Sequence, residues 1–318
     1  MQSIKNNSLI KLAVKILLLL SILVVIDFAF GQLLGSLLHE QTDGRYFKIE
    51  YSLNKCNEDV IIIGSSRAEA NYNPSIIENE LGLTCWNAGR GGQGLAYFYS
   101  IEASVLSRYS PKLIIVNIDQ NALEWPIDYD KSAILRPFVK QNPHIKELFS
   151  QKDWSEKYKL YSNIYAYNSA IFYFLRPFFI KGKDGKNSDK GWKPLEGQIN
   201  SSSIVQQHPR GYFDQTNNLN PEKISLLNKM ISLAQKKNCE LIFVFSPDFY
   251  PPLYKTSTNV YFKKLNREKN IKVIDLSADK QITGHPNYYK DIDHLNHIGA
   301  DIFTKRLIRE IRENSFII

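Results

Sequence analysis

The stretch Asp59-Val-Ile-Ile-Ile-Gly-Ser-Ser66 indicates the class of fold. A short run of β-branched residues that ends at a glycine is typical of a parallel strand that is covered on both faces and leaves the sheet in a tight turn. Similar apolar runs lie at 113–118, 241–245 and 271–276, with a weaker one at 84–87. We therefore expect these runs to form one parallel sheet.

Amphipathic segments with helical spacing lie between the apolar runs. They cover 74–80, 95–108, 221–237 and 297–313. Pro221 suits a first helical turn, and Asn296 suits an N-cap. The alternation predicts an α/β fold, a flavodoxin-like doubly wound parallel sheet with right-handed crossovers. In such sheets the reactive groups lie at the carboxyl ends of the strands.

The N-terminal residues predict a membrane anchor. From Leu9 to Leu38 the chain is overwhelmingly apolar, which is long enough to cross about 30 Å of hydrocarbon. Three lysines lie before or early in this run and acidic residues follow it, so the positive-inside rule places the N-terminus in the cytoplasm and residues after about 40 outside. Asp27 interrupts the run and is expected near the outer interface.

A cleaved signal peptide is the alternative, because Ala29-Phe30-Gly31 resembles a small-x-small cleavage site. Apolar residues continue beyond that site, which favours an uncleaved single-pass anchor in the cell inner membrane. We expect residues 1–38 to form a cytoplasmic tip and a transmembrane helix, 39–56 a juxtamembrane linker, and 57–318 the α/β domain. Under both alternatives the α/β domain lies outside the cytoplasm, in the periplasm or beyond the cell.

An insertion at about 124–220 departs from the strand–helix rhythm. It is rich in tyrosine and phenylalanine between Tyr158 and Phe179, and a polar segment follows at 181–191. We expect a partly helical structure around 154–176 and a mobile loop near 181–191. The aromatic residues fit the core face of a helix better than a surface for sugar or lipid.

Composition excludes several classes of protein. The 318 residues are 43% hydrophobic, which is enough for a packed core, and the net charge of +8 comes from basic residues scattered among 32 acidic ones. No helix carries a basic stripe, so we expect no nucleic-acid partner. Three cysteines, Cys56, Cys85 and Cys239, form no metal-binding pattern. A Cys56–Cys85 disulfide and three free thiols both remain open.

Candidate chemistry lies at the predicted strand ends. Ser66 follows the first strand, and Asp291-Ile-Asp-His294 comes directly before the last helix. A serine nucleophile needs a base within hydrogen-bond reach, and that base needs an orienting carboxylate. We prefer Asp291 to Asp293 as the orienting group. The glycines of Asn87-Ala-Gly-Arg-Gly-Gly92 and the amide of Asn121 are candidate donors to an oxyanion.

These motifs, taken in order, resemble the SGNH/GDSL hydrolase superfamily, especially its membrane-anchored bacterial branch linked to cell-envelope polysaccharide and acyl-group modification. The resemblance covers roughly 57–125 and 238–314. Gly64-Ser65-Ser66 stands where the family has Gly-Asp-Ser, and Asp291-Ile-Asp-His294 matches its DxxH block. Two departures are Ser65 in place of the usual aspartate and Asp119-Gln-Asn121 in place of Gly-x-Asn-Asp.

The resemblance implies a serine esterase or acyl transferase that forms a covalent ester on Ser66. His294 would be the base and Asp291 its orienting group, and the oxyanion would be held by Ser66, Gly92 and Asn121. It implies no metal or organic cofactor. Acylated glycan, with O-acetyl groups in first place, is the expected substrate, and envelope-polysaccharide machinery a possible partner.

Two other functions compete with this one. A catalytically idle protein of the same fold would bind glycan or serve in assembly. A flavodoxin-like phosphate binder would use the glycines at 89–94, but no GxGxxG or Walker pattern follows the first strand.

Overall fold

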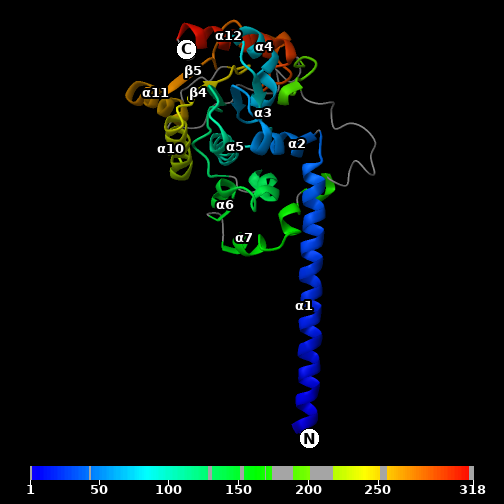
Figure 1. The fold of residues 1–318 in the computed structure, drawn as a ribbon. Helices are drawn as coiled ribbons and strands as arrows, with labels where there is room; N and C mark the ends of the chain where they lie inside the picture. The colour runs from blue at the N-terminus through cyan, green and yellow to red at the C-terminus, as the bar shows by residue number, and fades with distance from the viewer. Residues whose placement is uncertain are drawn as a thin grey trace. The chain divides into compact units, whose positions relative to one another are not determined.

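The computed structural model describes residues 2–42, 44–127, 131–150, 154–168, 170–173, 189–200, 218–250 and 256–314. The chain divides into two compact units (Figure 1). One contains Met1–Thr42 and Ala133–Gly182, and the other contains Asp43–Ser132 and Lys183–Ile318. The predicted nucleophile and base both belong to the second unit.

The second unit contains a five-stranded sheet in the order β2-β1-β3-β4-β5, with every pair of neighbours parallel. This is the flavodoxin-like doubly wound order, so the predicted fold class is confirmed. The strands are β1 (Val60–Ile63), β2 (Cys85–Asn87), β3 (Leu113–Asn117), β4 (Glu240–Phe245) and β5 (Lys272–Asp275). Each coincides with a predicted run to within one or two residues.

Helices cover both faces of this sheet because its strands are apolar on both sides. Ile62, Ile115 and Val244 pack with Phe303 and Leu307 on one face. On the opposite face, Phe243 and Phe245 contact the ring of Phe262. The helices are α3 (Ser66–Asn71), α4 (Pro74–Leu81), α5 (Leu95–Arg108), α10 (Pro221–Lys236), α11 (Ser257–Lys269) and α12 (His297–Glu313), with a short 3-10 turn, η5 (Pro286–Tyr288).

Local sequence signals set several of these helix boundaries. Asn296 accepts the N–H of Gly299 at 3.0 Å, and Asn220 accepts that of Lys223 at 3.1 Å, so both act as N-caps. The predicted limits of α5 and α12 are the observed ones. Helix α11 was not predicted because its sequence is polar, although Thr256 and Asn259 form a capping box at its start.

Residues 44–55, expected as a linker, are helical and belong to the unit that contains the sheet. They form α2 (Gly44–Glu50) and a π-helical segment, η1 (Tyr51–Lys55). Ile49 and Leu53 are buried, and the indole N–H of Trp86 donates to Ser52 Oγ at 2.8 Å. Burial of these apolar side chains stabilises a segment whose short sequence carries little helical signal.

The first unit contains α1 (Gln2–His39), the one helix in the described ranges that is long and apolar enough to cross a membrane, over Ser8–His39. The rest of this unit comes from the insertion. Its described elements there are α6 (Pro143–Ser150), α7 (Trp154–Lys159) and the 3-10 turn η3 (Tyr165–Tyr167), and another 3-10 segment, η2 (Lys131–Phe138), leads into it. Where they are described, residues 154–173 are thus partly helical, as expected.

The second half of the insertion returns to the unit that contains the sheet. The expected mobile loop lies outside the described residues except for 189–191, which form the 3-10 turn η4 (Asp189–Gly191). Beyond it, Trp192 Nε1 donates to the carbonyl of Ala70 at 2.7 Å, and Ile199 N–H donates to the carbonyl of Tyr289 at 2.8 Å. Residues 189–199 therefore pass beside α3 and the loop that precedes α12.

All three cysteines are buried free thiols. The Cys56 thiol donates to the carbonyl of Ser52 at 3.1 Å, and the guanidinium of Arg108 lies 3.2 Å from its sulfur. Burial raises the pKa of the Cys85 thiol well above its ordinary value. Of the two arrangements left open by the sequence, the structure has three free thiols.

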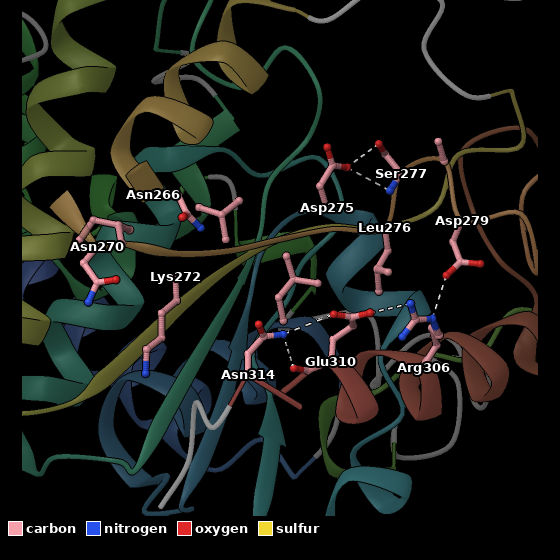
Figure 2. Close-up of a pocket in the computed structure, with 14 residues that line it drawn as sticks. Asn266, Asn270, Lys272, Asp275, Leu276, Ser277, Asp279, Arg306, Glu310 and Asn314 are labelled. Atoms are coloured by element: carbon pink, nitrogen blue, oxygen red, sulfur yellow. Dashed lines mark hydrogen bonds and ion pairs between the residues drawn. The ribbon is translucent and has the colours of Figure 1, made fainter. Parts of the chain in front are cut away.

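A polar hollow of about 810 Å³ borders the edge strand β5 (Figure 2). Arg306 lies inside it, 3.0 Å from Asp279 and 2.5 Å from Glu310. None of the residues predicted for the catalytic site lines this hollow.

Candidate active site

Ser66 is the first residue of α3, directly beyond the carboxyl end of β1. The chain turns at Gly64, whose φ is +155°. A Cβ on Gly64 would lie 2.6 Å from Ala68 Cβ and 3.0 Å from Asn117 Cβ, so only glycine fits this turn. The turn leaves Ser66 partly exposed while Ser65 is buried.

Asp291 organises the loop that carries His294. Its Oδ1 accepts the backbone N–H groups of Asp293 and His294, each at 2.9 Å. The same carboxylate lies 2.9 Å and 3.0 Å from the imidazole Nδ1 through its two oxygens. Leu295 N–H donates to Asn71 Oδ1 at 3.1 Å, which ties this loop to α3.

The structure brings Ser66 and His294 together across 228 residues of sequence. His294 Nε2 lies 2.7 Å from Ser66 Oγ. With Nδ1 donating to Asp291, a neutral imidazole leaves its Nε2 lone pair facing the serine hydroxyl. This is the arrangement in which a histidine can accept the proton of a serine.

The Asp291 carboxylate is suited to hold this tautomer. Burial raises its pKa, but the hydrogen bonds from His294 and from the backbone N–H of Asp293 outweigh that effect and hold the pKa below its ordinary value. The group is therefore ionised at neutral pH. Asp293 points elsewhere, since its Oδ1 lies 3.4 Å from an Arg67 nitrogen.

Arg67, next to Ser66 in sequence, is buried among carboxylates. It forms a tight ion pair with Asp248 and lies 3.7 Å from Asp119 and 3.4 Å from Asp293. Burial lowers its pKa, but these carboxylates outweigh burial and raise it, so the guanidinium stays charged. Asp248 lies beyond the end of β4, and that position alone could have marked it as a candidate site residue. Its pairing with Arg67 had no signal in the sequence.

The glycine loop after β2 approaches the serine at Gly91. A Cβ on Gly91 would lie 3.6 Å from Ser66 Cβ and 3.1 Å from Glu69 Oε2. Asn87 supports the start of the loop, because its side chain donates to the carbonyl of Ala68 at 2.7 Å and accepts the N–H of Gly89 at 2.9 Å. Gly92 has a φ of +76° and is exposed.

Glu69 links α3 to this loop. Its Oε2 accepts the backbone N–H of Gly91 at 2.9 Å, and its Oε1 lies 3.6 Å from Lys48 Nζ in α2. Burial lowers the pKa of Lys48 to about 8, although the Glu69 carboxylate opposes that shift. The N–H of Gly91 is thus engaged by Glu69, while Gly92 N–H has no acceptor within the ranges that the structure describes.

Asn121 lies in the turn after β3, where its carbonyl accepts the N–H of Glu124 at 3.2 Å. In the described part of the chain, its side chain makes no hydrogen bond to Ser66, His294 or the glycine loop. Asn117, at the end of β3, is instead fully buried and accepts the Tyr72 hydroxyl at 2.8 Å. The three residues of the predicted triad therefore lie together, but among the described residues no hydrogen bond orients the Asn121 side chain toward them.

Among the described residues, no group of three or more histidine, cysteine, aspartate or glutamate side chains is arranged to hold a metal ion. The geometry of Ser66, His294 and Asp291 is suited to proton transfer and nucleophilic attack.

Comparisons with known proteins find similarity in structure only. No protein-family model matches the sequence, and no curated protein matches it. A protein assigned to the G-D-S-L family of lipolytic proteins from Desulfitobacterium hafniense has a TM-score of 0.40 at 12% identity, covering 79% of this chain and 97% of its own. A protein assigned as an acylhydrolase from Bacteroides fragilis has a TM-score of 0.41 at 15% identity, covering 86% and 99%. At this level of similarity, the geometry of the site carries the functional conclusion.

Proposed function

We propose that this chain is an SGNH-type serine esterase or acyl transferase. The single observation that supports this most strongly is the Asp291–His294–Ser66 relay, with 2.9 Å and 2.7 Å between successive groups. Three side chains in this order are what an activated serine requires. Their convergence at the carboxyl end of β1 is also where a doubly wound fold places its reactive groups.

In the proposed reaction, Ser66 Oγ attacks an ester carbonyl while its proton passes to His294 Nε2. The bond from the carbonyl carbon to the alcohol oxygen breaks, and the imidazolium returns the proton to that leaving oxygen. An ester between Ser66 and the acyl group remains. Water or a sugar hydroxyl then attacks it, with His294 again taking and returning the proton.

The oxyanion formed in each attack needs donors aimed at it. We assign the N–H groups of Ser66 and Gly92 to this role, because Gly92 lies next to the point where the loop approaches Ser66 and its N–H has no acceptor within the described ranges. Asn121 is the proposed third donor. To fill this role from the turn after β3, the Asn121 side chain would have to rotate toward the substrate.

We propose O-acetyl groups on cell-envelope glycans as the substrate and the extracytoplasmic face of the inner membrane as the site of action. The motif resemblance and the charge pattern around the apolar helix support this assignment. A reporter enzyme that works only outside the cytoplasm should be active when it is fused after Ile318. Activity of a reporter that works only in the cytoplasm would contradict the proposed orientation.

The deciding experiment uses the full chain in detergent or nanodiscs. Wild type should release acetate from p-nitrophenyl acetate or acetylated glycan and should be labelled by a fluorophosphonate. Ser66→Ala should lose both, whereas Ser65→Ala, a matched change one residue away, should retain most of both. A protein that is folded but is not labelled, under conditions that label a known serine esterase, would instead be the catalytically idle glycan-binding or assembly protein.

A further inference from the structure

One face of α1 is shaped to receive a segment of the insertion. Asp27 accepts four hydrogen bonds from this segment: Ser162 Oγ at 2.5 Å, Asn163 N–H at 2.7 Å, Asn163 Nδ2 at 2.8 Å and Ile164 N–H at 3.1 Å. A carboxylate in an apolar helix is costly unless its oxygens find donors. Residues 162–164 supply those donors, so Asp27 is the point at which this segment of the insertion docks on α1.

Glycines continue this face along the helix. Gly31 and Gly35 follow Asp27 at intervals of four residues and therefore lie on the same side of α1. A Cβ on Gly31 would lie 2.2 Å from Asn163 Cβ, and one on Gly35 would lie 3.0 Å from the Tyr167 hydroxyl. We call Asp27, Gly31 and Gly35 the docking face, because larger side chains at the glycines would displace residues 162–167.

The docking face begins where the fully exposed part of α1 ends. Residues 8–26 are exposed without exception, and burial starts at Asp27 and Gly31. At 1.5 Å per residue, residues 8–26 span about 28 Å, close to the ~30 Å hydrocarbon thickness of a bilayer. An exposed apolar surface of this length is suited to lipid. On the side of the docking face it ends at Asp27, whereas Phe28 and Phe30 on the rest of the helix stay exposed.

The segment held at that level exposes large aromatic side chains. Tyr158, Tyr161 and Phe172 are 60%, 72% and 81% exposed. Lys157 and Lys159 are also exposed and alternate with Tyr158 at the end of α7. Exposed tyrosine and phenylalanine interleaved with lysine are the composition of protein surfaces that lie at lipid headgroups.

We propose that α1 is retained in the mature protein and that its docking face holds residues 155–168 and 170–173 against the bilayer, with Tyr158, Tyr161 and Phe172 at the level of the lipid headgroups. Removal of α1 by cleavage after Ala29-Phe30-Gly31 would take Asp27 and Gly31 away, leave only Gly35 on the mature chain and destroy the face. The lysines would contact the phosphates of anionic lipids. This inference is independent of the chemistry at Ser66.

The contact with lipid can be measured on the full chain in liposomes of phosphatidylethanolamine and phosphatidylglycerol. The native cysteines are buried, so nitroxide labels can be placed at Tyr158→Cys, Tyr161→Cys and Phe172→Cys, with Lys146→Cys on α6 as the exposed control in the same unit. The ratio of collisions with oxygen to collisions with a water-soluble nickel complex should be several-fold higher at the three aromatic positions than at Lys146. Equal ratios at all four positions would overturn the proposal, and protection from both reagents would indicate a protein or glycan cover instead.

Two further measurements test the docking face itself. Gly31→Leu should lower the oxygen-to-nickel ratio of a label at position 161, whereas Ala29→Leu, on an exposed part of the same helix, should leave it unchanged. An unchanged ratio in Gly31→Leu would refute the docking face. N-terminal sequencing of the protein from membranes should find α1 intact, and a mature chain that begins near Gln32 would refute its retention.

Discussion

Glu69 Oε2 accepts the backbone N–H of Gly91 at 2.9 Å. Glu69 follows Ser66 by three residues in α3, so the two side chains lie on one face of that helix. The contact therefore couples the helix that begins at Ser66, the proposed nucleophile, to the glycine loop proposed to bind the oxyanion. Lys48, from α2, balances the charge of the same carboxylate.

Loss of this contact should affect the rate of catalysis more than it affects substrate binding. In Glu69→Leu the Gly91 N–H loses its acceptor, and we expect kcat to fall about tenfold with little change in KM, less than the ~10² to 10³ lost when an oxyanion donor itself is removed. Glu69→Gln keeps an acceptor oxygen and should recover most of the rate. Steady-state kinetics on p-nitrophenyl acetate, with the unfolding temperature measured in parallel, check this. Equal losses in the two variants would contradict a positioning role.

The orienting role proposed for Asp291 can be tested against the neighbouring carboxylate of Asp293. Asp291→Asn keeps an oxygen for the backbone N–H groups of the loop but favours the wrong imidazole tautomer, so kcat should fall by about 10³ or more. Fluorophosphonate should still label Ser66, although slowly. Asp293→Asn, which changes a carboxylate beside Arg67, should lower kcat far less. A larger loss in Asp293→Asn would transfer the orienting role to that residue.

Arg67 should matter for stability as well as for the site. Arg67→Met would leave Asp248 buried without its partner, and removing one member of a buried ion pair costs about 3 to 5 kcal/mol. Arg312→Met, which breaks an exposed pair with Glu80 at 3.2 Å, should cost less than about 1 kcal/mol. Urea unfolding of both variants measures the difference. Similar losses would mean that Asp248 is neutral or solvated in the folded protein.

Glu102 should make the folded state less stable as pH rises. Its carboxyl is fully buried in α5 without a hydrogen-bond partner among the described residues, and burial raises its pKa to about 8. The folded state therefore holds a proton that the unfolded chain loses near pH 4.3, so unfolding is increasingly favoured between about pH 4.3 and pH 8.

This pH dependence can be isolated by substitution. In wild type, the free energy of unfolding should fall by a few kcal/mol between pH 5 and pH 8, and Glu102→Gln should abolish this fall. The change Glu313→Gln, at an exposed position of α12, should leave the wild-type slope intact. Thermal unfolding across this range provides the measurement. A wild-type stability that is flat with pH would mean that Glu102 has a partner or reaches water in the folded protein.

The local elements were predictable from the sequence because their signals lie within a few residues. The apolar runs identified all five strands, and Asn296 marked the start of α12. The pairing of Asp291 with His294 also followed from sequence, since a loop of four residues brings the two side chains together. Helix α11 was missed because few of its residues are apolar, although Phe262 and Leu265 are buried at helical spacing. The segment 44–55 was missed because a short sequence carries little helical signal, and burial stabilises it.

The contacts that turn these elements into a site depend on packing between distant segments. Ser66 and His294 meet across 228 residues because parallel strands and their crossover helices bring the end of β1 next to the start of α12. The ion pair of Arg67 with Asp248 and the docking of Asn163 on Asp27 are likewise long-range. Periodicity and capping act over one or two helical turns, so they determine where elements form, whereas burial of shared apolar surface determines which side chains they bring together.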